Sequence, residues 1–484
     1  MRLFLLLGAG LILSGCATVN TVTPEKPELT DHFVEATSQS TEQSTSEPSN
    51  QSGRQVLANE DAWWLAFDDD KLNTLIQLAL KNNYSLKISY ARLQQSQANW
   101  EKAGSAQLPD LNLNLQHSQQ WQDSGSSSNL DSSNGQYQVG LNASYELDFW
   151  GRVAALDEQA LQQYYATEAA VHIQTNTVVS QVTLSWYGWV KETQQLQLLH
   201  HQQQRIQNAL TVVEGRFLRG TVIASDIWQQ EQLLESIHTD IINSETRQDI
   251  YRQQLALWLG KSKVDETLLA LPGDDYQIPQ ILQATATVSS AALQQRPDVL
   301  QAYAQLQAAS AGLQVAETNR YPRFTLSASY SSLATSPEQI LANWATSFIA
   351  GLTMPLFDGG NLAAEVKRNE AVVAEQMASY QQVLLLAMQE IEEALLNEKQ
   401  QLSLQTSVQY QLQLASQTQT FQGQRYLRGV GDFLSLLKSQ QDVLSLERQT
   451  LGAEFSQLQY RIQLLTTLSH GRFTNVDEKE IEHE

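Results

Sequence analysis

Apolar and polar residues alternate in two stretches of each half of the chain. In the first half, apolar side chains occupy every second position of LNLNLQ (111–116) and of YQVGLNASYELDF (137–149). The same alternation returns at 324–330 and, with more exceptions, at 344–356. A period of two predicts β-strands with one apolar and one polar face. We therefore expect four strands, at about 110–120, 137–149, 323–332 and 344–356, paired as two hairpins.

Long stretches of helical character follow each hairpin. Residues 361–422 contain neither glycine nor proline, and residues 156–214 contain only Gly188. At 1.5 Å per residue, 361–422 would extend about 90 Å, a length typical of coiled-coil packing. A second helical stretch follows each of these, at about 224–259 and 432–468, and another precedes the first hairpin at about 72–106.

A five-residue phrase occurs twice, as RFLRG at 216–220 and RYLRG at 425–429, 209 positions apart (425 − 216). Two other landmarks repeat at nearly the same interval. Pro109 and Pro322 precede the two hairpins, and FWGRVAAL (149–156) and FDGGNLAA (357–364) follow them. The chain is therefore a tandem duplication with a period near 210 residues, and RxLRG is predicted at the turn between two helices, where glycine accommodates a left-handed backbone.

The N-terminal sequence MRLFLLLGAGLILSGC has a basic residue, a short apolar run and small residues before Cys16. This pattern predicts a signal peptide at 1–15, and its last four residues resemble a lipobox that directs lipidation of Cys16. An ordinary signal peptide with an incidental cysteine is the alternative. Residues 35–55 are rich in Ser, Thr and Gln, so 16–60 is expected to be a lipidated N-terminus with a flexible tether.

The net charge of −22, from 30 basic and 52 acidic side chains, excludes the basic surface that nucleic-acid binding requires. No stretch after the signal peptide approaches about 18 consecutive apolar residues, so a membrane-spanning helix is not expected. If the chain enters a membrane, it must do so as strands of a closed barrel, and four strands per chain are too few to close one. A soluble antiparallel sheet in a helical lipoprotein is the alternative.

Motifs of catalysis are incomplete in this sequence. Gly260-Lys261-Ser262 lacks the first glycine of a phosphate-binding loop, and GVG at 429–431 has Leu434 in place of the third glycine of a dinucleotide fingerprint. The adjacent His200 and His201 face different sides of a helix. We expect no enzyme activity, no cofactor and no metal site, and we expect the tryptophans at 186, 189 and 258 to be packing residues.

Four phrases carry a resemblance to a known family: YELDFWGRV (145–153), RPDVLQAYAQLQAASAGLQVAETNRYPRFTLSASY (296–330), MPLFDGGNL (354–362) and RYLRGVGDFLSLLKSQQDVLSLERQ (425–449). Together with the lipobox and the duplication, they resemble TolC/OprM-type outer membrane factors, in particular the NodT-like lipoproteins of tripartite RND-type efflux pumps. The resemblance covers residues 63–469.

The resemblance implies an α+β membrane protein: a duplicated protomer with four transmembrane strands and long coiled-coil helices. Three protomers would form a 12-stranded β-barrel continuous with a periplasmic α-helical barrel. Its repeats would occupy 61–260 and 287–469, joined by an equatorial linker at 261–286 and followed by an acidic tail at 470–484. The homotrimer would sit among outer membrane lipids and conduct small toxic compounds or drugs passively from a periplasmic adaptor and an inner-membrane RND-type pump.

The resemblance also assigns functions to the helix tips. Matching positions place Leu434, Lys438 and Asp432 at the periplasmic aperture. Lys438 departs from the family pattern, in which an acidic residue is common, so either a nearby acid such as Asp432 pairs with it or the aperture is held differently. The residues expected to dock the adaptor are Arg216, Arg219, Gly220, Arg425, Tyr426, Arg428 and Gly429.

Two other functions remain open at this point. A channel of the same fold could serve an ATP-driven exporter of proteins or peptides, although the lipobox favours the efflux branch. A structural periplasmic lipoprotein without a pore is the second alternative, and a soluble monomer after removal of Cys16 would support it.

Overall fold

The computed structural model describes residues 62–122, 132–271, 276, 278–279, 293–340 and 342–469. The expected signal peptide, the lipidation site Cys16, the tether and the acidic tail at 470–484 lie outside these residues. Across the described ranges, no helix combines the length and the apolar character needed to cross a bilayer.

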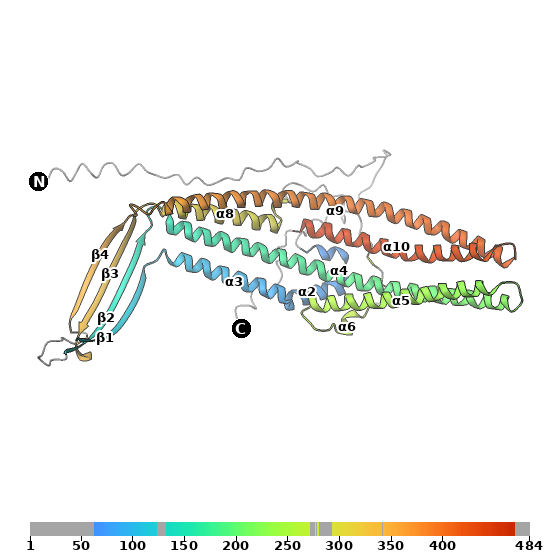
Figure 1. Cartoon of the computed structure of the whole chain (residues 1–484), viewed down its shortest axis with the longest axis horizontal. Coiled ribbons are helices and arrows are strands. Elements are labelled where there is room, and N and C mark those ends of the chain that lie inside the picture. Colours follow the sequence, from blue (N-terminus) through green and yellow to red (C-terminus); the bar gives the residue numbers. More distant parts are fainter. Residues whose placement is uncertain are drawn as a thin grey trace, which may run out of the picture. The chain divides into compact units, whose positions relative to one another are not determined.

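Each half of the chain contributes the same series of elements (Figure 1). The first series is α3 (Tyr84–Ser105), β1 (Asp110–Gln122), β2 (Ser132–Leu147), α4 (Arg152–Phe217) and α5 (Ala224–Trp258). The second is α8 (Pro297–Thr318), β3 (Arg323–Ala334), β4 (Trp344–Thr353), α9 (Asn361–Leu427) and α10 (Phe433–Leu468). The shorter elements are η1 (Trp63–Phe67), α2 (Asp70–Asn82), α6 (Glu266–Leu269) and η2 (Pro337–Gln339).

The element lengths confirm the duplication. Helices α4 and α9 have 66 and 67 residues, and α5 and α10 have 35 and 36. The first residues of α9 and α10 follow those of α4 and α5 by 209 positions (361 − 152 and 433 − 224). The interval read from the RxLRG phrase therefore holds for the helices on both sides of each tip.

The four strands form one antiparallel sheet in the order β1-β2-β3-β4 (Figure 1). Strand β2 pairs with β3, so the two repeats meet inside a single sheet, for example through Leu141 opposite Tyr330. All four expected strands are present. Strand β4 ends at Thr353, earlier than expected, because Pro355 has no N–H for the ladder.

The expected helix at 72–106 is interrupted at Asn83. Its backbone is extended there, with φ −61° and ψ 127°. The Asn83 side-chain amide donates to the carbonyl oxygen of Trp258 at 2.8 Å, and its oxygen accepts from the Leu86 N–H at 3.1 Å, which caps α3. Side-chain hydrogen bonds of asparagine compete with helical backbone bonds, so α2 and α3 are two helices.

Contacts within the chain define two compact units. One contains the sheet with the adjoining parts of α3, α4, α8 and α9, within Arg92–Glu168 and Gln301–Gln382. The other contains α2, α5, α10 and the remaining parts of α4 and α9. In this second unit, an apolar core surrounds Trp186 and Tyr187, both fully buried, and packs them against η1, α2, α5 and α10.

Candidate functional site at the helix tips

The α4–α5 and α9–α10 pairs each turn at a glycine in the same geometry. Gly220 and Gly429 have φ of +73° and +76°, in the region that glycine adopts without steric cost. In each turn the glycine N–H donates to the carbonyl three residues back, and the next N–H donates five residues back. These distances are 2.8 and 3.1 Å in the first turn and 3.0 and 3.1 Å in the second. Both turns are therefore Schellman motifs, as the repeated phrase predicted for a helix end.

A side chain from the first tip holds the second tip. Arg216 Nη1 donates to the backbone carbonyl of Tyr426 at 2.9 Å, and its guanidinium carbon lies 4.3 Å from the centroid of the Tyr426 ring. One cation thus contacts both the main chain and the aromatic face of one residue. Two of the residues expected to dock an adaptor are in this way an internal link between the repeats.

Tyr426 is also part of an apolar core beneath the tips. Only 6% of its surface is exposed, and its ring centroid lies 5.9 Å from that of Phe433. Val213 and Leu233 of the first repeat belong to the same cluster. Burial raises the pKa of the Tyr426 phenol, so this side chain stays neutral at physiological pH.

The three residues expected at the aperture lie at the start of α10. Leu434 and Lys438 are exposed and stand one turn apart on the same side of the helix. Asp432 caps α10 by accepting from the N–H of Ser435 at 2.9 Å and from its hydroxyl at 2.7 Å. These hydrogen bonds hold the pKa of Asp432 below its usual range. Within the described part of the protomer, Lys438 forms no ion pair, with Asp432 or with any other acid.

The remaining expected docking residues are exposed at the two turns. Arg219 and Arg428 occupy corresponding positions there, and Arg425 Nη2 donates to the carbonyl of Val430 at 3.2 Å. The sequence reading missed the apolar side chains that surround these arginines. Those exposed by 42–86% are Phe217, Leu218, Ile223, Leu427 and Val430. Their position directly beside RxLRG was the available signal, because exposed apolar side chains gathered in one place are typical of an interaction surface.

Polar side chains tie α5 to α4 and to α10. Glu192 of α4 is almost fully buried and accepts from Ser244 at 2.6 Å and from Arg247 at 3.0 Å, both on α5. On α10, Arg448 donates to Asp240 of α5 at 2.8 Å. These bonds hold the helix pairs in register.

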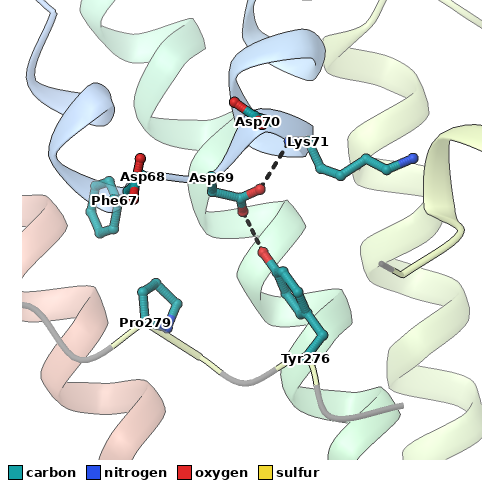
Figure 2. A pocket seen from close by; sticks show the side chains of 7 residues that line it. All are labelled: Phe67, Asp68, Asp69, Asp70, Lys71, Tyr276 and Pro279. Carbon is teal, nitrogen blue, oxygen red and sulfur yellow. Dashed lines mark hydrogen bonds between the residues drawn. The ribbon is translucent and has the colours of Figure 1, made fainter. Parts of the chain in front are cut away.

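A small pocket of about 310 Å³ lies beside the start of α2 (Figure 2). Asp69 caps α2 through the Lys71 and Leu72 N–H groups at 2.9 and 3.1 Å, and its other oxygen accepts from Trp186 Nε1 at 2.9 Å and from the Tyr276 hydroxyl. Burial raises the pKa of Tyr276, so it stays a donor. Both carboxylate oxygens of Asp69 already accept hydrogen bonds from the protein, so we assign Asp69 a structural role: it connects the start of α2 to Trp186 and Tyr276. No group of three or more His, Cys, Asp or Glu side chains in the described ranges could hold a metal ion.

Comparison with known proteins adds independent evidence. The model of a family described as "Outer membrane efflux protein" matches residues 75–261 and 288–470. The chain is 30% identical over 426 residues to the pyoverdine export outer membrane protein OpmQ of Pseudomonas aeruginosa, covering 87% of this chain and 89% of that protein. It is 28% identical over 414 residues to the cation efflux system protein CusC of Escherichia coli, covering 84% and 88%.

A solved structure shows the same fold. The Campylobacter jejuni CmeC outer membrane channel superposes with a TM-score of 0.81, covering 96% of this chain and 97% of that one at 21% identity.

Proposed function

This chain belongs to the outer membrane efflux protein family, and from that premise we propose that it forms the exit duct of one tripartite system, receiving small toxic compounds from a periplasmic adaptor and an RND-type pump. It is an efflux channel of the outer membrane, and its family is one of channels and not of enzymes. The observation that carries the proposal is the sheet: its apolar face includes Leu111, Leu113 and Leu115, each 63–68% exposed, as a lipid-facing surface requires.

We infer that three protomers close this sheet into a barrel. Strands β1 and β4 are edges of the four-stranded sheet, and unpaired edges are costly in a membrane. Three copies supply twelve strands, an even number within the range of outer membrane barrels. The same threefold arrangement would bring three copies of Leu434 and Lys438 around one axis, where they form the aperture.

The helix tips are the docking surface in this proposal. Exposed arginines lie there beside exposed apolar side chains such as Leu218 and Leu427, a mixture typical of protein interfaces. The adaptor would bind these turns, and dilation of the aperture would follow from their displacement. Two relatives that are 30% and 28% identical to this chain are named for pyoverdine export and for cation efflux. We therefore propose that the pump, and not the duct, selects the transported compound.

In-cell crosslinking tests the proposal. A photoreactive residue replaces Arg428 at the tip, and a matched variant carries it at Gln204, which is exposed on α4 and lies 12 positions before the first tip phrase begins (216 − 204). We expect Arg428 to capture an adaptor in complexes that contain a proton-driven pump, and Gln204 to capture much less of it.

Each other result contradicts part of the proposal. An ATP-driven exporter in the captured complexes would indicate protein or peptide export. Crosslinks only between copies of this chain, in cells that contain its neighbours, would indicate a structural lipoprotein without a pump.

A further inference from the structure

The register of the sheet identifies which side chains share its polar face. Asn142 pairs with Asn112 on β1 and with Ser329 on β3, and Ser329 pairs with Ser347 on β4. Directly paired residues point to the same side of a sheet, so these four lie on one face, opposite the apolar face that contains Leu113. In the proposed duct this face lines the lumen, and the inference below rests on that proposal.

Amides and hydroxyls dominate this face on β1, β2 and β3. The amides are Asn112, Asn114, Gln116, Gln136, Gln138 and Asn142, all exposed. On β3, serine or threonine occupies each polar-face position from Thr325 to Ser331. The face is therefore rich in groups that both donate and accept hydrogen bonds.

Formal charges on this face are confined to one end, where the strands meet the helices. In the described ranges, none occurs on the polar face from 111 to 118, 136 to 144, 325 to 333 or 345 to 351. At the helix end, Glu146 accepts from Arg152 at 2.8 and 2.7 Å, which neutralises it. Asp110 and Arg323, also at that end, carry opposite charges. A chain with a net charge of −22 thus has, in the described ranges, a sheet face without formal charges beyond its helix end.

We propose that the strand-lined part of the duct is a charge-neutral passage that selects by size and hydrogen bonding, and that admits cations, anions and zwitterions alike. A lumen lined by charges of one sign focuses its field and enriches counter-ions about tenfold or more. Amide and hydroxyl dipoles can instead reorient toward a solute of either sign. Charge selection then belongs to the helical part of the duct, for example at Lys438.

Cysteine reporters measure the local potential directly. Cys16 is the one native cysteine and lies outside the sheet, so the parent protein supplies the background. We would introduce Asn142→Cys and Ser329→Cys as two separate variants of the full-length protein and reconstitute each variant in liposomes. Each variant is then reacted with a cationic and with an anionic methanethiosulfonate of similar size. The ratio of the two rates, divided by the ratio for a small free thiol, reports the potential at that site.

We expect a normalised ratio within about twofold of one, with little change between low and high salt. As a positive control, Gln138→Glu is combined with the Asn142→Cys reporter. This variant should raise the normalised ratio of cationic to anionic rates severalfold in low salt, because three copies of the new negative charge face one lumen. A ratio near ten or above in the protein without this added charge, falling in high salt, would overturn the neutral lining.

Leu141→Cys and Ala328→Cys, on the apolar face, separate this inference from the duct itself. In lipid they should react far more slowly than their polar-face neighbours with both reagents. If they react faster than Asn142→Cys and Ser329→Cys, the polar face does not line water, and the duct proposal fails together with the inference. If the polar-face cysteines react faster than the apolar-face cysteines, but the normalised ratio of cationic to anionic rates is near ten or above, only the neutral lining fails.

Discussion

Arg216 and Tyr426 are 210 residues apart in the chain, yet the Arg216 guanidinium lies on the Tyr426 ring at 4.3 Å and donates to its backbone carbonyl at 2.9 Å. The contact joins the two copies of the RxLRG phrase. It fixes the last turn of α9, where Tyr426 anchors the apolar core beneath the tips. The two helix hairpins are therefore coupled at the point where the proposed aperture opens.

Replacing Arg216 with alanine should loosen the second tip. The lost hydrogen bond and cation–π contact correspond to about 1–3 kcal/mol at a partly exposed site. In planar bilayers, the purified R216A trimer should open more often than the parent. Arg219→Ala is the matched control, because Arg219 is exposed in the same turn and its side chain has no hydrogen bond or ion pair within the described chain. Equal behaviour of the two variants would show that other contacts hold the tip.

Gly188 in the middle of α4 makes room for an aromatic ring. A β-carbon at this position would lie 2.3–2.6 Å from the ring atoms of Tyr251 on α5. Glycine to alanine in a helix ordinarily stabilises by about 0.5–1 kcal/mol. At Gly188 the clash should reverse the sign and lower the melting temperature.

Two further variants test this steric explanation. Gly215 lies in the same helix, and a β-carbon added there would meet no atom within 4 Å, so Gly215→Ala should be neutral or stabilising. Adding Tyr251→Ala to Gly188→Ala should restore part of the loss, measured as a coupling in a double-mutant cycle by circular dichroism. Additive effects would mean that Tyr251 is not the obstacle.

Much of the fold follows from the sequence, because its signals are local and periodic. Alternation over 111–116 and 137–149 is enough to identify strands, and RxLRG with its glycine is enough to identify a helix end. The early start of β2, at Ser132, carries no such signal, since serine, asparagine, glycine and glutamine precede the first apolar residue.

Contacts between distant residues were not predictable in this way. Asp69 accepts from Trp186 and Tyr276, which are 117 and 207 positions away, and no periodicity relates them. Trp186 was correctly predicted to be a packing residue, but its hydrogen bond was not foreseen. Arg216 and Tyr426 were both assigned to the tips, while their mutual contact depends on how the repeats pack.

The buried carboxylate of Glu192 predicts a dependence of stability on pH. Burial raises its pKa, but hydrogen bonds from Arg247, Lys191 and Ser244 outweigh burial and hold the pKa below the usual 4.5. A depressed carboxylate pKa contributes stability above the unfolded value, and this contribution is lost as pH falls through the folded value. The parent should therefore lose stability below about pH 4.5.

Glu192→Gln should lower the melting temperature at neutral pH and flatten its decline in acid. Glu235→Gln is the control, because Glu235 is exposed and, in the described chain, its carboxylate pairs only with His238. Thermal melts at a series of pH values give both curves. An unchanged acid decline in Glu192→Gln would assign the pH dependence to other carboxylates.

Leu113 and Asn114 are adjacent in β1, and each is exposed, but they point to opposite faces of the sheet. If the apolar face meets lipid, arginine at Leu113 places a charge among acyl chains at a cost of about 2–4 kcal/mol near the bilayer midplane. Arginine at Asn114 meets water in the lumen and should cost much less. The amount of heat-labile trimer in outer membranes should therefore fall in L113R and remain near the parental amount in N114R. The reverse order would place the polar face against lipid and exclude the barrel, whereas equal tolerance of both substitutions would show that the sheet lies outside the membrane.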